Sequence, residues 1–112
     1  MEIRIDGKPT PVDLVKPASF AERLDVHTIL GANPHRALAC ALGLCWPRIR
    51  RRLPYRGDPI AYGGQVLDQL HSERAELSDV MDVGAKALAL CMEIPTEVQV
   101  KAAMGNSDAP EG

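Results

Sequence analysis

Aromatic side chains are scarce in this chain, which has one Phe, one Trp and two Tyr, or 4% of its residues. A hydrophobic core must therefore rest mainly on aliphatic residues, and a row of stacking platforms for single-stranded nucleic acid is not expected. Long apolar runs are also missing. The longest covers ten residues, 37–46, whereas a membrane-spanning helix needs about 20. The N-terminus alternates charged and apolar residues, unlike a signal peptide, so we expect a protein of the cytoplasm.

Motifs for metal binding and catalysis are missing as well. No C-x-x-C or H-x-x-x-H pair occurs, and Cys40 and Cys45 would point about 140° apart on a helix. These two and Cys91 lie in Ala- and Leu-rich segments, where thiols are reduced, buried and unreactive. Gly63-Gly64 lacks the lysine of a phosphate loop. The sequence therefore predicts no metal, no cofactor, no catalytic residue and no enzymatic activity.

The length of 112 residues and the balance of 46% hydrophobic and 25% charged residues fit one globular domain. We expect the domain over residues 1–105 and a flexible tail over 106–112. Within it, residues 1–16 are predicted to form a β-hairpin. Residues 2–5 alternate polar and apolar, Asp6-Gly7 is a turn signal, and residues 12–15 are predicted to return as the second strand.

Helical signals fill residues 19–105. Ser19 with Glu22 forms a capping box for a helix that ends near Leu30. Asn33-Pro34 and Asp58-Pro59 each combine an N-cap with proline in the first turn. Residues 48–57, between the helix that starts at Pro34 and the one that starts at Pro59, are interpreted as a connector. Gly63-Gly64 is expected to weaken or kink the helix that starts at Pro59.

Two further helices are predicted, one starting at Ser78 or Asp79 and ending at Pro95, and a short one over residues 96–105. The expected fold is mainly α, with a short N-terminal hairpin packed on a compact bundle of four or five short helices. The first helix is expected to turn Phe20, Leu24 and His27 or Thr28 inward. The expected core is Leu38, Leu42, Trp46, Leu67, Leu70, Val83, Ala87, Leu90 and Ile94. Small residues near Ala37, Ala41 and Gly84 are expected to leave a groove for a partner helix.

Charge is divided along the chain. Residues 1–57 hold ten Lys and Arg against five Asp and Glu, a formal +5, whereas residues 58–112 hold three against ten, a formal −7. Separate faces of opposite charge would favour an acidic partner or self-association, although pairing within the molecule would neutralise much of this charge. A basic run, Arg48–Arg56, lies between Trp46 and Gly57. Arg and aromatic residues are enriched in binding hot spots, so we predict an exposed interface formed by Trp46, Arg48, Arg50, Arg51, Arg52, Leu53, Tyr55 and Arg56.

The same arginines offer an alternative, a small regulator that binds nucleic acid through Arg48–Arg56. A run of this kind is a minimal footprint for phosphate binding. The chain as a whole carries a net charge of −2, however, and the helix that follows is acidic to neutral. Protein binding is therefore the preferred hypothesis.

The layout of the chain resembles a known family. An N-terminal hairpin with IRIDGKPTPV, a helical body with NPHRALACALGLCWP and YGGQVLDQL, and an ending GNSDAPEG are similar to tail assembly chaperones of long-tailed bacteriophages and prophages. The resemblance implies a non-enzymatic morphogenesis protein of the bacterial host cytoplasm. Its implied partners are the helical tape measure protein and the tail tube subunits. It supplies no binding residues of its own.

Overall fold

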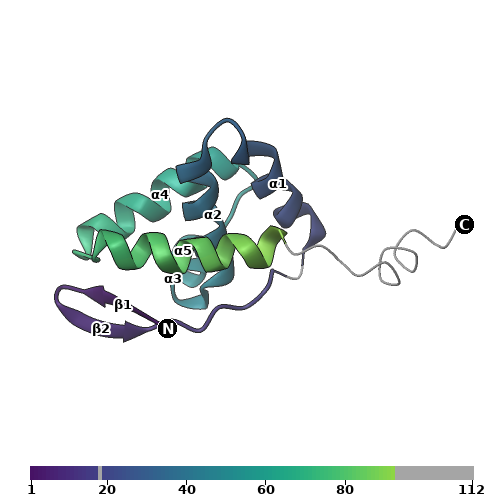
Figure 1. The fold of residues 1–112 in the computed structure, drawn as a ribbon. Coiled ribbons are helices and arrows are strands. Elements are labelled where there is room, and N and C mark those ends of the chain that lie inside the picture. The colour runs from purple at the N-terminus through teal and green to yellow at the C-terminus, as the bar shows by residue number, and fades with distance from the viewer. Residues whose placement is uncertain (18, 93–112) are drawn as a thin grey trace, which may run out of the picture.

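The structure is a computed structural model that describes residues 1–17 and 19–92, and within them the chain is mainly helical (Figure 1). The elements are β1 (Glu2–Ile5), β2 (Lys8–Pro11), α1 (Phe20–Leu30), α2 (Pro34–Cys45), α3 (Pro47–Arg52), α4 (Pro59–Ser72) and α5 (Leu77–Met92). The expected fold class, an N-terminal hairpin on a compact helical bundle, is confirmed. The helix expected over residues 96–105 and the tail over 106–112 lie outside the described residues.

Three helix starts lie where the capping signals predict them. The side-chain oxygens of Ser19, Asn33 and Asp58 accept hydrogen bonds from backbone amides three residues further on, at 3.3, 3.3 and 3.1 Å. Pro34 and Pro59 occupy the first turn of their helices, where a missing amide costs nothing. These bonds satisfy amides that have no partner within the helix.

The turn of the hairpin is confirmed, but the prediction of the second strand over residues 12–15 is wrong. Asp6 and Gly7 have φ angles of 53° and 78°, as a two-residue turn between twisted strands requires. Such a turn places Lys8 opposite Ile5 at once, so the second strand is β2, Lys8–Pro11. Val12 is still buried in the core, but it lies beyond the end of that strand.

The register of the hairpin explains how β2 tolerates two prolines. Pro9 pairs with Arg4 and Pro11 pairs with Glu2, alternate positions counted from the turn. In an antiparallel pair closed by a two-residue turn, these are the positions at which the backbone amide points away from the neighbouring strand. The hairpin therefore loses no hydrogen bond, and its outer edge offers fewer donors to a third strand.

The other edge of the hairpin is docked on the turn between α4 and α5 (Figure 1). The backbone amide of Glu76 donates to the oxygen of Arg4 at 2.7 Å, and the amide of Asp6 donates to the oxygen of Arg74 at 3.0 Å. Asp79 accepts from both the backbone amide and Nε of Arg4 at 2.9 Å. Because α5 already begins at Leu77, neither Ser78 nor Asp79 caps it, and Asp79 binds the hairpin instead.

Helix α2 lies at the centre of the bundle and packs against α1, α3, α4 and α5. Residues 37–46 are all buried except Leu38, which is partly buried. A Cβ atom on Gly63 would lie 2.4 Å from the backbone oxygen of Arg36. The glycine pair of α4 thus lets α4 approach α2 closely. Helix α4 runs unbroken from Pro59 to Ser72, so the glycine pair does not interrupt it.

The predicted core is confirmed in large part. Leu42, Trp46, Leu70, Val83 and Ala87 are buried, while Leu38, Leu67 and Leu90 are only partly buried. Ile94 lies outside the described residues.

The predicted inner face of α1 is wrong. Phe20 and Leu24 are 65% and 48% exposed, whereas Val26 and Ile29 are buried. Helix α1 is turned so that Glu22 and Asp25, on the same side as Val26 and Ile29, reach polar groups near α3.

The expected groove of small residues is filled by the protein itself. Ala37 and Ala41 are fully buried. Leu38 packs so tightly on Gly84 of α5 that a Cβ atom there would lie 2.1 Å from Leu38 Cδ2. The small residues therefore serve contacts between the helices of this chain and do not admit a partner helix.

Candidate functional site

The predicted interface, residues 46–56, contains a helix where a connector was expected. Pro47 stands in the first turn of α3, and the amide of Leu53 closes the helix on the oxygen of Ile49 at 2.8 Å. Ile49 is fully buried and anchors the helix to the core. Trp46 is only 3% exposed, so it belongs to the core and is not available as an interface anchor.

Arg50 is tied into the fold. Its Nη1 and Nη2 donate to the two carboxylate oxygens of Glu22 at 2.8 and 2.5 Å. Nη1 also donates to the backbone oxygen of Leu44, near the end of α2, at 3.4 Å. The hydrogen bond from Arg50 to Glu22 raises the pKa of Arg50. This bidentate ion pair connects α3 to α1, so Arg50 has a structural role in the free protein.

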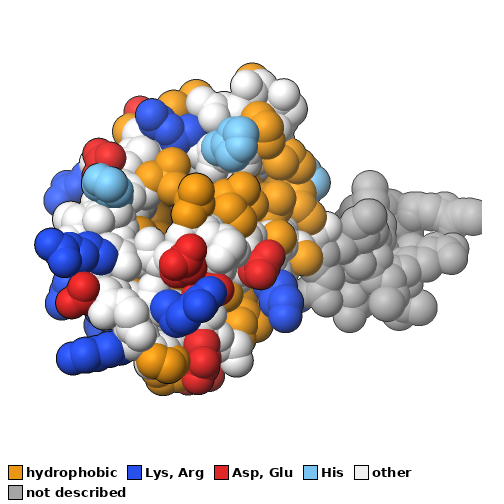
Figure 2. Space-filling view, turned by 60° about the vertical axis from the view of Figure 1, so that its left-hand side comes forward, with side chains coloured by type: hydrophobic (Ala, Val, Ile, Leu, Met, Phe, Trp, Pro, Cys, Tyr) orange, Lys and Arg blue, Asp and Glu red, His pale blue; other side chains and the backbone are white. Residues whose placement is uncertain are grey.

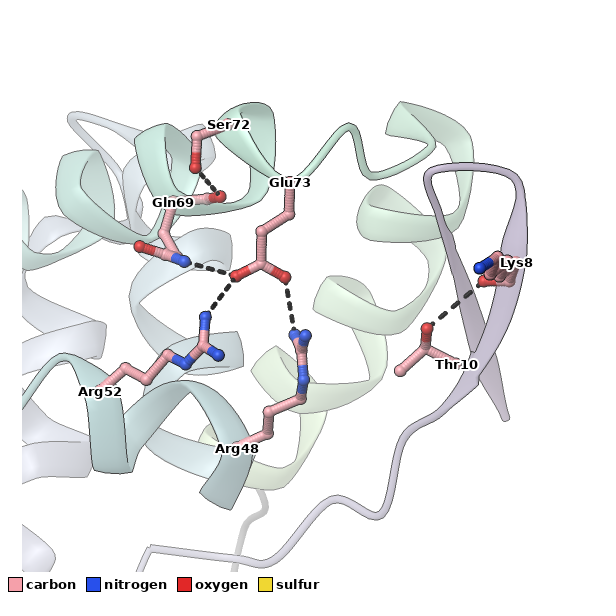
Figure 3. Close-up of polar contacts among 7 residues, drawn as sticks. All are labelled: Lys8, Thr10, Arg48, Arg52, Gln69, Ser72 and Glu73. Carbon is pink, nitrogen blue, oxygen red and sulfur yellow. Dashed lines mark hydrogen bonds and ion pairs between the residues drawn. The ribbon is translucent and has the colours of Figure 1, made fainter.

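Arg48 and Arg52 share one carboxylate, that of Glu73 at the end of α4 (Figure 3). The two distances are 2.9 and 3.2 Å, and the side-chain amide of Gln69 donates to the same carboxylate. Burial pushes the pKa of Glu73 upward, but the hydrogen bonds from Gln69 and Arg48 and the two positive charges outweigh it, so the pKa is lowered. Arg48 also lies over the ring of Trp46, 5.4 Å from its centre.

Tyr55 extends this polar network beyond the end of α3. Its hydroxyl donates to Asp25 of α1 at 2.5 Å, and its ring meets Tyr62 of α4 edge to face. Burial and the bond to Asp25 raise the pKa of Tyr55. Tyr55 and Leu53 are both partly buried. Like Arg48, Arg50 and Arg52, they hold the segment onto α1 and α4.

Arg51, Arg52 and Arg56 are the exposed arginines of the predicted set. Of these, Arg51 and Arg56 have no ion-pair partner among residues 1–17 and 19–92. Arg48, Arg50 and Arg52 are paired with Glu73 and Glu22, although Arg52 is itself exposed, so the predicted interface contains both paired and unpaired arginines.

A pocket beside α3 contains Arg51, and we call it the linker pocket. It has a volume of about 400 Å³ and is lined by Val15, Lys16, Pro17, Leu44, Cys45, Pro47, Arg50 and Arg51. The backbone amide of Val15 donates to the oxygen of Cys45 at 2.7 Å, which fixes the extended linker against the end of α2. The Val15 side chain is nevertheless 56% exposed. The walls are mostly apolar, and every charged side chain on them is basic.

Sequence reasoning identified Arg50 and Arg51 but missed the rest of the linker pocket. Val15, Lys16 and Pro17 were assigned to the hairpin or to the segment after it. No local motif marks them, because the pocket exists only once the linker lies along the end of α2.

The charge division along the sequence is partly neutralised within the molecule. Arg4 pairs with Asp79, and Arg48 and Arg52 pair with Glu73, so the basic half meets the acidic half in space. On the face shown in Figure 2, acidic and basic side chains lie interspersed below a continuous hydrophobic area. Two separate charged faces are not visible on that side.

The cysteines are buried, and burial raises the pKa of Cys40 to about 12. Within residues 1–17 and 19–92, no group of three or more His, Cys, Asp or Glu side chains is arranged to hold a metal ion. In the same part of the chain, no helix has the length and apolar character needed to cross a membrane. Neither a known protein family nor a curated protein nor a solved structure matches this chain.

Proposed function

We propose that this protein binds another protein without catalysing a reaction, and that an acidic, apolar segment of the partner occupies the linker pocket. The observation that carries this proposal is the lining of the pocket, which combines apolar walls with exclusively basic charged side chains. Val15 and Arg51 are the key residues. Val15 presents an exposed apolar side chain and Arg51 an exposed guanidinium, and both are already fixed to ordered backbone.

The chemistry of the pocket defines the occupant. An apolar side chain of the partner gains free energy by leaving water for the wall formed by Pro17, Leu44 and Pro47. A carboxylate next to it gains a charged hydrogen bond from Arg51. Because Arg51 has no carboxylate partner in the described part of the chain, this bond replaces only water.

The layout of the sequence extends the proposal to a biological role. As in the tail assembly chaperones it resembles, the protein would act in the cytoplasm of a bacterial host, with the helical tape measure protein and the tail tube subunits as partners. Genes for a tail tube upstream and a very long helical protein downstream would support this role. Without such neighbours, the assignment to phage assembly fails while partner binding in the pocket stays testable.

Nucleic-acid binding is the weaker hypothesis. Phosphate contacts need cations that are not already engaged, and Arg48, Arg50 and Arg52 are bound to Glu73 and Glu22. Binding a duplex through the whole run would require breaking these pairs. Two outward arginines, Arg51 and Arg56, make a small footprint.

Fluorescence anisotropy tests the proposal with a labelled amphipathic peptide whose apolar face of Leu is flanked by Asp and Glu. We expect binding by the wild type and weaker binding by Arg51→Ser and Val15→Ser. The matched control is Arg56→Ser, which removes the same charge from the same segment outside the linker pocket. A duplex DNA probe serves as the second arm. If the DNA binds and its affinity falls steeply with salt while the peptide does not bind, the nucleic-acid hypothesis replaces ours.

A further inference from the structure

The thiols of Cys45 and Cys91 meet inside the molecule, where the end of α2 lies against the last turns of α5. Their sulfur atoms are 3.8 Å apart, in contact and within reach of a hydrogen bond between the two thiols. The two residues are 0% and 1% exposed. The Cys45 sulfur also lies 3.7 Å from the backbone oxygen of Ala87, one turn before Cys91. Two cysteines that are 46 residues apart in the sequence and lie on different helices therefore hold their thiols in contact.

We propose that Cys45 and Cys91 form an oxidation site that takes a small-molecule disulfide as its co-reactant and becomes an intramolecular disulfide. In the first step, the Cys91 thiolate attacks one sulfur of the disulfide RSSR, which breaks its S–S bond, forms Cys91–S–S–R and releases RS⁻. In the second step, the Cys45 thiolate attacks the Cys91 sulfur and expels the second RS⁻. The protein loses two protons and two electrons, and RSSR becomes two molecules of RSH.

The contact between the thiols assigns the two roles. The contact with the Cys45 thiol stabilises the Cys91 thiolate and lowers the pKa of Cys91. The contact with Cys91 and burial raise the pKa of Cys45, and the Cys45 thiol donates to the backbone oxygen of Ala87 at 3.7 Å, which holds its proton. Cys91 is accordingly the first nucleophile. Once Cys91 carries the mixed disulfide, Cys45 is already beside it, and the second step is intramolecular.

The third cysteine is not part of the site. Cys40 lies five residues before Cys45 on α2, which places it about 140° further round the helix. In the part of the chain that the structure describes, no sulfur contact joins it to either partner. The Cys45 and Cys91 sulfurs, now 3.8 Å apart, must approach to the ~2.04 Å of a disulfide.

Oxidation has a structural consequence that can be measured. The new bond would close a loop containing α3, α4 and most of α5 and would fix the last turns of α5 to the end of α2. A cross-link of this length restricts the unfolded chain, so the oxidised protein should unfold at a higher temperature. Because both thiols are buried, the reaction should be slow. This inference concerns the contact between α2 and α5 and does not depend on a partner in the linker pocket.

The test incubates the reduced full-length protein with oxidised glutathione and follows the intact mass. We expect the mass of two hydrogen atoms to be lost without a lasting glutathione adduct, and a higher midpoint of thermal unfolding that dithiothreitol reverses. Digestion without reduction should link the peptide containing Cys91 to the one containing Cys45. Trypsin leaves Cys40 and Cys45 in one peptide, so fragmentation of the linked pair must place the bond on Cys45.

Two variants sharpen the assignment. Cys40→Ala should form the same cross-link, whereas Cys45→Ala should stop at a glutathione adduct on Cys91. A bond to Cys40, a stable adduct on the wild type, or a wild-type protein that stays fully reduced after prolonged incubation would each overturn the proposal. Fragmentation of the wild-type peptides decides between Cys40 and Cys45 even where a variant does not fold.

Discussion

The guanidinium of Arg50 and the carboxylate of Glu22 meet through two parallel hydrogen bonds, at 2.8 and 2.5 Å. This pair joins α3 to α1 across 28 residues of sequence. Both Arg50 and Arg51 line the linker pocket, but the guanidinium of Arg50 is bound to Glu22 while that of Arg51 has no carboxylate partner in the described part of the chain. One residue of the basic run is thus available to a partner where its neighbour is not.

Replacing Arg50 by Ser should therefore destabilise the protein. A partly exposed, bidentate Arg–carboxylate pair contributes about 1–2 kcal/mol to stability. Arg51→Ser should change stability by less than about 0.5 kcal/mol, as surface substitutions usually do. Urea unfolding followed by circular dichroism measures both. Equal midpoints for the two variants would show that the Arg50–Glu22 pair does not support the fold.

Leu42 and Leu90 should respond differently to truncation. Leu42 is fully buried on α2, so Leu42→Ala should cost about 2–5 kcal/mol. Leu90 is only partly buried and removes less apolar surface from water, so Leu90→Ala should cost about 1–2 kcal/mol. The difference between their urea midpoints checks this order. A larger loss for Leu90 would mean that the orientation of α5 is wrong.

The close approach of α4 to α2 predicts a strong effect at Gly63. A Cβ atom there would lie 2.4 Å from the backbone oxygen of Arg36, which cannot move without shifting α2. We expect Gly63→Ala to cost about 1–3 kcal/mol. The control is Gly31→Ala, since Gly31 has φ −68° and no neighbour within 4 Å of an added Cβ. Thermal unfolding should show Gly31→Ala to be neutral or stabilised by up to about 1 kcal/mol.

The lowered pKa of Glu73 makes its contribution to stability depend on pH. Hydrogen bonds and the charges of Arg48 and Arg52 keep Glu73 ionised in the folded protein at a pH at which the Glu73 carboxylate of the unfolded chain is already protonated. Its contribution is therefore fully present above the unfolded pKa, whose ordinary value is 4.5, and is lost as the pH falls through the folded pKa. Glu73→Gln should lower the unfolding temperature at neutral pH, and the gap to the wild type should narrow in acid. A gap that widens below pH 4.5 would contradict this account.

How far the fold follows from the sequence depends on the range of the interaction. The starts of α1, α2 and α4 were predictable because Ser19, Asn33 and Asp58 bind amides only three residues away. The apolar residues after Pro11 predict a second strand over residues 12–15, whereas the two-residue turn at Asp6-Gly7 places Lys8 directly opposite Ile5.

The candidate site was less predictable. Helical spacing predicts Phe20 and Leu24 on the inner face of the first helix, whereas the orientation of α1 also serves contacts of Glu22 and Asp25 that no local pattern reveals. The Arg52–Glu73 contact joins residues 21 apart through the arrangement of α3 and α4. Interactions of this range become visible only in the folded chain.

The most direct test of the central claim is a charge swap across the linker pocket. Arg51→Glu should weaken binding of the acidic amphipathic peptide at least about tenfold, and a peptide with Lys in place of its acidic residues should regain affinity for that variant alone. Arg56→Glu makes the same change of charge outside the linker pocket and should do neither. Titration calorimetry of the three proteins against the two peptides gives the result. If Arg51→Glu and Arg56→Glu weaken binding equally, or if the Lys peptide shows no preference for Arg51→Glu, the linker pocket is not the binding site.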